Sequence, residues 1–214
     1  MKNDIRGQVL KDMVEKFPLL SQCVKSITSA LDLMHYSHKN DNFIFVCGNG
    51  GSASDAEHIV GELVKKFTKK RKVNHSVLDY IQKKFPEDYL LFEKHLNDGF
   101  RIFSLNSQQS LITAIANDES YDFIFAQQLL VYGKPGDVLI AISTSGNSIN
   151  LVNAAKIALA KNMNVVSLVG GDGGELSSLS HETICVPDYN TMTIQEMHIV
   201  IYHSIAYILE HESF

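Results

Sequence analysis

The spacing of apolar residues along the chain predicts alternating helices and short strands. In residues 4–37 they recur every three or four positions, which is typical of helices with one buried side. Pro18 divides this stretch into helices at about 4–16 and 19–37. Further helices are predicted from Ser54, over 150–162 and over 191–212. Short apolar runs predict buried strands at 43–47, 101–105, 137–143, 164–170 and 183–187.

The alternation of these strands with helices indicates a single α/β domain over residues 1–214. Strands that alternate with helices form a parallel sheet, which right-handed crossovers cover with helices on both faces. Residues 68–100 do not follow the alternation, because they are charged, contain two short amphipathic pieces and end at the turn-forming Asp98 and Gly99. We interpret them as an insertion at one edge of the sheet.

The composition excludes several classes of protein. The net charge of the 214 residues is −5, which disfavours a nucleic-acid-binding protein held by bulk charge. The one dense basic run, Lys65–Lys72, is interpreted as a solvated face or loop. No N-terminal signal core is visible, and no apolar stretch approaches the roughly 18 residues that span a bilayer. Three widely spaced cysteines suit no disulfide framework and fit a reducing cytoplasm.

Two loops rich in glycine and hydroxyl groups follow predicted strands. "CGNGGS" (47–52) leads from the first strand into a helix, and "STSGNS" (143–148) does so after the third. Both would offer backbone amides and a helix N-terminus to an anion, at the strand ends where α/β sheets bind ligands. A simple turn and helix cap is the alternative for either loop alone. Neither a P-loop nor GxGxxG is present, which favours a small phosphorylated molecule.

Two helices carry further candidate residues. His58 and Glu62 lie four residues apart on the helix after the first loop, so they share a face. They could bind Zn²⁺, Glu62 could act as a general base, or the two could form an ordinary surface pair. Gln195 and His203 lie two turns apart on one side of the last helix. His198 and His203 differ by about 140° around that helix, so one of them is expected in the core or an interface.

Four motifs in order resemble the sugar isomerase (SIS) domain and, more narrowly, the phosphoheptose isomerases. They are "CGNGGSASDAEHIVGEL", "ITAIANDESYD", "ISTSGNS" and "IQEMHIVIYH", and the resemblance covers nearly the whole chain except 68–100. It implies a flavodoxin-like sheet, long N- and C-terminal helices, and a cytoplasmic homotetramer with sites at subunit boundaries and one zinc ion per subunit. It also implies conversion of sedoheptulose 7-phosphate to D-glycero-D-manno-heptose 7-phosphate through an enediol(ate), for bacterial lipopolysaccharide or capsule.

The resemblance assigns roles to individual residues. Those implied for the substrate phosphate are Ser52, Ser143, Thr144, Ser145 and Ser148. Those implied for the sugar are Asn49, Gly50, Gly51, Asn117, Asp118 and Gln195, although Asn117 and Asp118 alone suit a helix C-cap. Those implied for zinc are His58, Glu62, Gln195 and His203. Glu62 and His203 also form the implied acid/base pair, and His198 then lies off the site.

Departures from the family leave some details open. Met192 stands where family members have an acidic residue, and Lys66 where they have an arginine after the catalytic helix. The insertion at 68–100 could border the site and change which sugar phosphate fits. The alternatives within the same fold are a non-catalytic protein that binds the replication initiator and a module that senses a sugar phosphate. The complete His58, Glu62, Gln195 and His203 set favours catalysis over both.

Overall fold

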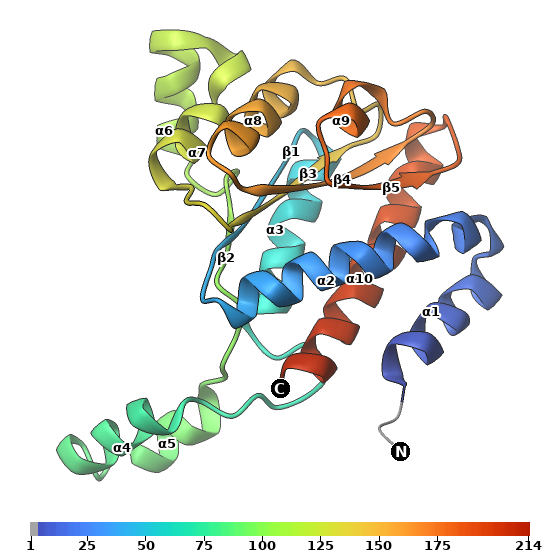
Figure 1. The fold of residues 1–214 in the computed structure, drawn as a ribbon. Coiled ribbons are helices and arrows are strands. Elements are labelled where there is room, and N and C mark those ends of the chain that lie inside the picture. The colour runs from blue at the N-terminus through green and yellow to red at the C-terminus, as the bar shows by residue number, and fades with distance from the viewer. Residues whose placement is uncertain (1–3) are drawn as a thin grey trace.

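A five-stranded parallel sheet forms the centre of the computed structural model, which describes residues 4–214 (Figure 1). The strands are β1 (Ile44–Gly48), β2 (Ile102–Ser104), β3 (Val138–Ser143), β4 (Asn164–Gly170) and β5 (Glu182–Val186). Their order across the sheet is β2-β1-β3-β4-β5, and every neighbouring pair is parallel. This is the flavodoxin-like order. The five predicted strands are confirmed to within one residue at each end.

Helices cover both faces of the sheet because successive strand residues point to opposite sides. Ile44 and Val46 of β1 pack into one hydrophobic cluster, while Phe45 and Cys47 pack into the other. The helices of the first cluster are α1 (Ile5–Lys16), α2 (Val24–Lys39), α3 (Gly51–Val64) and α10 (Thr191–Ser213). Those on the second side are α6 (Gln109–Ile115), α7 (Ala126–Tyr132), α8 (Ile149–Ala160) and α9 (Gly174–Ser178). The predicted two-sided α/β architecture is therefore confirmed.

Two predicted helices begin elsewhere than expected. Residues 18–23 form a 3-10 turn, η1 (Pro18–Cys23), before α2, so the predicted helix 19–37 is two pieces. A 3-10 helix has three residues per turn, so Leu20 and Cys23 lie on the same side of it, and both are buried. The helix predicted from Ser54 begins three residues earlier, because Gly50 adopts a φ of 55° and turns the chain directly into α3.

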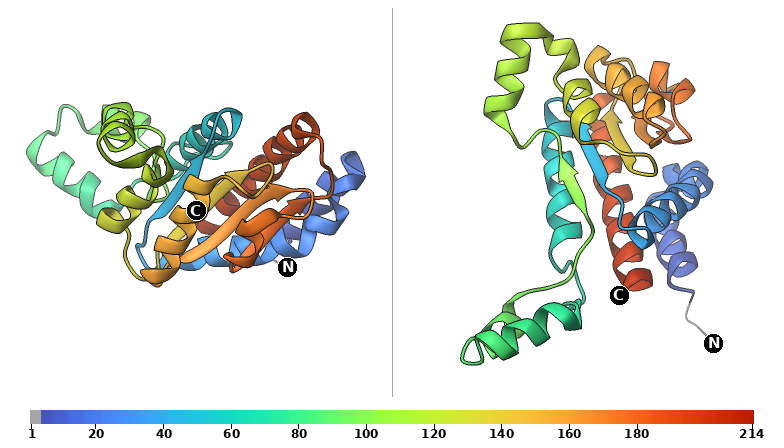
Figure 2. Two further views of the ribbon diagram at one scale, coloured as in Figure 1. Left: turned by 90° about the horizontal axis from the view of Figure 1, so that it is seen from above. Right: turned by 60° about the vertical axis from the view of Figure 1, so that its left-hand side comes forward.

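The segment that we interpreted as an insertion forms two short helices, α4 (His75–Lys84) and α5 (Tyr89–His95), that project away from the sheet (Figure 2). Leu78 is their one buried residue. This helical hairpin, made of α4 and α5, joins the rest of the chain at the amino end of β2. That end of the sheet is opposite the edge from which α3 and α8 depart (Figure 1). The interpretation of the basic run 65–72 as solvated is wrong for Arg71, whose side chain is completely buried.

The remaining short turns follow α6. They are a π-helical turn, η2 (Ala116–Ser120), and a 3-10 turn, η3 (Tyr121–Phe123). Among residues 4–214, no helix combines the length and the apolar character needed to cross a membrane.

Candidate active site

The two predicted anion loops lie side by side at the carboxyl edge of the sheet. β1 and β3 are parallel neighbours in which Gly48 pairs with Ile142, so the segments after them leave the sheet together. One continues into α3 and the other into α8. This is the edge at which ligands bind in open α/β sheets.

An amide pair ties the two loops together. Asn49, in the first loop, and Asn150, in the first turn of α8, each donate their side-chain N–H to the other's Oδ1 at 2.9 Å. The hydroxyl of Tyr121 donates to the same Asn49 oxygen at 3.1 Å. The sequence analysis missed Asn150 and Tyr121. Its position in the first turn of the helix that follows the serine loop was the available signal for Asn150.

The serine loop is folded around Gly146. This residue has a φ of 67°, and a Cβ on it would lie 1.9 Å from the carbonyl oxygen of Gly173, so only glycine fits. Its N–H donates to the Ser143 hydroxyl at 3.1 Å, and the Ser143 and Ser148 hydroxyls lie 3.4 Å apart. Ser148 is the N-cap of α8 but makes no side-chain capping bond. The first N–H groups of α8 are thus available to an anion.

Gln195 of α10 reaches the first loop. A Cβ on Gly51 would lie 2.6 Å from Gln195 Nε2, so the amide rests directly on the glycine backbone. Ser52, the next residue, is buried in the first turn of α3. The N-terminal turns of α10 and of α3 therefore meet at the first loop, as the roles implied for Gln195 and Ser52 require.

Further along the same two helices, His58, Glu62 and His203 form a cluster. His58 Nε2 lies 3.4 Å from Glu62 Oε1, and the rings of His58 and His203 are 5.1 Å apart between centroids. Lys65 Nζ lies 2.9 Å from the other Glu62 oxygen. Burial and the neighbouring His58 lower the pKa of His203, against an opposing effect of Glu62. His203 is therefore a neutral imidazole over a wider pH range than an ordinary histidine.

A hydrogen-bonded chain lies behind His58. The Tyr202 hydroxyl is 3.2 Å from Asp55 Oδ1, to which it donates, and 2.9 Å from His58 Nδ1. Burial raises the pKa of Asp55 and that of Tyr202. The sequence analysis missed Asp55 and Tyr202. Their signals were modest: Asp55 lies three residues before His58, and so on the same side of α3, and Tyr202 adjoins His203.

Other predicted residues lie apart from this cluster. Asn117 and Asp118 are exposed in the π-helical turn, where Asn117 Nδ2 donates to Asp118 Oδ1 at 2.8 Å. His198 is fully buried, with Nε2 at 3.3 Å from the Val169 carbonyl oxygen, and burial lowers its pKa to about 4. The expectation that either His198 or His203 belongs to the core or an interface is confirmed for His198. Met192 is exposed at the start of α10.

The predicted zinc residues do not form a ready-made metal site in this chain. Gln195 lies at the first loop, whereas the side chains of His58, Glu62 and His203 gather further along the helices. Within the described part of the chain, no group of three or more His, Cys, Asp or Glu residues is arranged to bind a metal ion. The His58–Glu62 pair by itself supplies one nitrogen and one oxygen.

Comparisons with known proteins agree with the observed fold. The SIS domain model matches residues 13–84 and 92–170. The phosphoheptose isomerase of Shewanella halifaxensis (strain HAW-EB4) is 37% identical over 217 residues, covering 100% of this chain and 97% of that protein. A phosphoheptose isomerase structure from Francisella tularensis has a TM-score of 0.75 at 26% identity, covering 99% of both chains. The phosphoheptose isomerase structure from Neisseria gonorrhoeae has a TM-score of 0.72 at 30% identity, covering 96% of this chain and 93% of that one.

Proposed function

The chain belongs to the SIS-domain family, and from that membership we propose that it is a phosphoheptose isomerase. Its reaction is the conversion of sedoheptulose 7-phosphate to D-glycero-D-manno-heptose 7-phosphate. The observation that carries this assignment is the cluster of His58, Glu62 and His203 on α3 and α10. α3 starts at the first anion loop and Gln195 of α10 reaches the same loop, so a phosphate-bearing substrate held there extends along both helices.

The serine loop and the two helix N-termini bind the phosphate in this proposal. Ser145 is exposed and Ser148 half-buried, so their hydroxyls are accessible, and the free N–H groups of α8 lie beside them. Ser52 belongs to the first turn of α3, which presents its own N-terminus to the same edge. Hydroxyl and amide donors at helix N-termini favour a doubly charged phosphate group.

The length of the site favours a long sugar phosphate. Glu62 lies ten residues beyond Ser52 along α3, a rise of about 15 Å, which the N-terminal lean of helical side chains shortens. A phosphate at the loops therefore leaves room for an extended sugar chain whose far end meets Glu62. A three-carbon sugar phosphate would stop short of that carboxylate.

The chemistry is a proton shift between C1 and C2. Glu62 removes a proton from C1 of the ketose, and His203 donates one to the carbonyl oxygen on C2, which gives the enediol. Glu62 then returns its proton to C2, and His203 takes the proton from the C1 hydroxyl as the aldehyde forms. A neutral imidazole suits this role because it can both donate and accept, and burial favours that form of His203.

Incubation of the purified protein with sedoheptulose 7-phosphate, with aldose formation followed over time, tests the assignment. Turnover that disappears in Glu62→Gln supports it. Binding of the sugar phosphate without turnover would instead favour a sensor, and binding of the replication initiator without either would favour the non-catalytic alternative.

A homotetramer with one zinc per subunit and a cytoplasmic location belong to the same proposal. His203 lines an open cavity of about 1050 Å³ between α1 and α10, together with Met13, Phe67 and Tyr207, so a second chain has room to complete the site. Light scattering should give the mass of a tetramer. Elemental analysis of protein purified without a metal-affinity tag should give zinc near one per chain, lost in His58→Ala, and metal-free native protein that is active after chelation would remove zinc from the proposal.

A further inference from the structure

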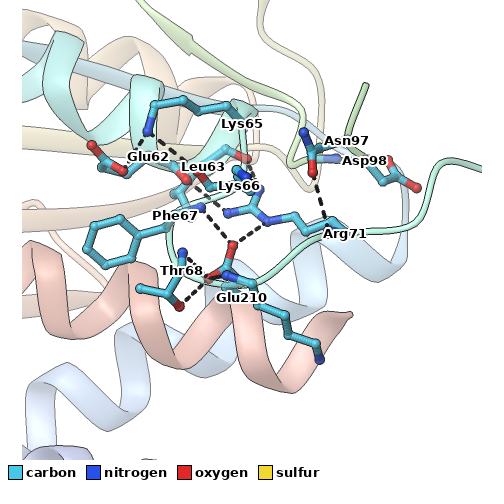
Figure 3. Close-up of polar contacts among 12 residues, drawn as sticks. Glu62, Leu63, Lys65, Lys66, Phe67, Thr68, Arg71, Asn97, Asp98 and Glu210 are labelled. Carbon is cyan, nitrogen blue, oxygen red and sulfur yellow. Dashed lines mark hydrogen bonds and ion pairs between the residues drawn. The ribbon is translucent and has the colours of Figure 1, made fainter. Parts of the chain in front are cut away.

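The guanidinium of Arg71 is buried at the point where α3 ends (Figure 3). Its Nη1 donates to the Leu63 carbonyl oxygen at 2.6 Å and its Nη2 to the Glu62 carbonyl oxygen at 2.9 Å. The last carbonyls of a helix have no partner within the helix, and a cation there also complements the helix dipole. Arg71 therefore closes the end of the helix that carries the proposed catalytic base.

The same guanidinium is bound to α10 through Glu210. Arg71 Nε donates to Glu210 Oε1 at 2.9 Å, and both side chains are 0% exposed. The Glu210 carboxylate also accepts from the backbone N–H of Phe67 at 2.8 Å, of Thr68 at 2.7 Å and of Lys69 at 2.9 Å. The loop between α3 and the insertion is thus folded around one carboxylate of α10, as Figure 3 shows.

Glu210 remains ionised at neutral pH. Burial alone would raise the pKa of its carboxyl, but the hydrogen bonds from Thr68, Phe67 and Arg71 outweigh burial and lower the pKa to about 2. The carboxylate is therefore available to hold the guanidinium at neutral pH.

This network joins the two helices that carry the acid/base pair. Glu62 offers its side chain to the site and its own carbonyl to Arg71, and Glu210 lies two turns beyond His203 on α10. Phe67, held through its N–H by Glu210, stacks on the His203 ring with 5.7 Å between centroids. We propose that Arg71 and Glu210 are positioning residues that set the spacing of Glu62 and His203. This inference rests on the proposed isomerase function, although one of its tests does not.

The packing of this network and its hydrogen bonds to the backbone are separate contributions. A buried ion pair is often replaced by packed apolar side chains without loss of stability. Apolar side chains could not bind the carbonyls of Glu62 and Leu63 or the amides of the following loop. The double variant Arg71→Met/Glu210→Leu therefore separates folding from positioning.

The main experiment compares Arg71→Lys with the wild type and with Arg101→Lys. Lysine keeps the positive charge but lacks the branched guanidinium, which donates to three acceptors at once. Arg101 is the matched control, because it also contacts a carboxylate and a carbonyl, both of Asp41, but on the surface. In Arg71→Lys we expect kcat to fall about tenfold or more, with KM changed less than about threefold. The deuterium isotope effect with ketose labelled at C1 should rise, which a smaller folded fraction would not produce.

A second measurement does not depend on turnover. Without the Arg71 guanidinium, Glu210 and the Phe67 backbone that it binds are held less firmly. The NMR signals of the His203 imidazole should therefore shift in Arg71→Lys and remain unchanged in Arg101→Lys. An inactive wild type would refute the isomerase assignment, while this comparison would still test the positioning. The proposal is overturned by folded Arg71→Lys with kcat within about twofold of wild type and unshifted His203 signals. It is also overturned by a folded double variant with the wild-type kcat and isotope effect.

Discussion

The hydroxyl of Tyr202 lies 2.9 Å from Nδ1 of His58, which leaves Nε2 of the imidazole facing Glu62. The tyrosine therefore orients the histidine from behind. Tyr202 precedes His203 on α10, so one turn of that helix both orients the histidine of α3 and supplies the second histidine of the cluster.

Tyr202→Phe should lower kcat about tenfold or more while the fold persists, since loss of a partner behind a functional histidine has effects of that size. The ring still fills its space, but Asp55 loses the donor to its buried carboxyl, so unfolding free energy should fall by about 1–3 kcal/mol. Steady-state kinetics and thermal unfolding measure the two effects, with Tyr36→Phe, at an exposed position of α2, as the control. Unchanged kcat in Tyr202→Phe would remove the tyrosine from the site.

Ser145→Ala should raise KM about tenfold or more, because each hydrogen bond to a charged phosphate contributes roughly 1.5–3 kcal/mol. Ser26→Ala is the matched control, since its hydroxyl donates to the Cys23 carbonyl where η1 meets α2. Initial rates over a range of substrate concentration give the comparison. Equal KM values for the two variants would show that the Ser145 loop does not bind the phosphate.

Glu62→Gln should lower kcat by roughly 10²–10⁴, the range for a lost general base. The exchange is nearly isosteric, so folding should persist, and His203→Ala should be comparably damaging. His198→Ala serves as the control because His198 lies in the core. We expect it to cost less than about tenfold in kcat. A folded His198→Ala that is slower than His203→Ala would contradict the assigned acid/base pair.

His198 should make the protein less stable at acid pH. Burial lowers its pKa to about 4 in the folded chain from the ordinary histidine value of 6.5, so protonation favours the unfolded state. The stabilisation that depends on neutral His198 is fully present above pH 6.5 and is lost as the pH falls toward 4. The free energy of unfolding decreases by about 3 kcal/mol in total over this range. Unfolding free energy measured between pH 6.5 and 5 should depend less on pH in His198→Leu than in wild type. Equal slopes would contradict this.

The sequence predicted what depends on local pattern. Apolar runs gave the five strands, helical spacing paired His58 with Glu62, and the glycine and serine loops follow from residues adjacent in the chain. The predicted start of α3 at Ser54 was too late, because we took the glycines before it to be a separate loop. In the structure, Gly50 turns the chain straight into the helix.

Contacts between distant segments could not be predicted in the same way. Asn150 meets Asn49 across 101 positions, and Tyr202 meets His58 across 144. Arg71 lies in a run of lysines that looks solvated, and only the buried Glu210, 139 positions later, explains its burial. Local composition carries no information about such partners, because the fold brings them together.

Deletion of residues 73–96, bridged by a short Gly/Ser linker, should leave a protein that unfolds cooperatively. The base of the hairpin is closed by Arg71, whose N–H donates to Asn97 Oδ1 at 3.4 Å and whose carbonyl accepts from Asp98 N–H at 3.4 Å. The deletion removes the exposed apolar side chains of α4 and α5, among them Leu90 and Leu91, and one buried residue, Leu78. The sheet and the Arg71 network stay intact.

Thermal unfolding and light scattering should therefore show a folded protein of the same subunit number, with kcat within about threefold of wild type. A longer deletion of 71–97 is the matched control. It removes the Arg71 guanidinium, which leaves the buried Glu210 carboxylate without its cation and the Glu62 carbonyl without that donor, so the protein should aggregate or unfold at a much lower temperature. Aggregation of the shorter deletion, or loss of its subunit assembly, would show instead that the hairpin packs against another chain.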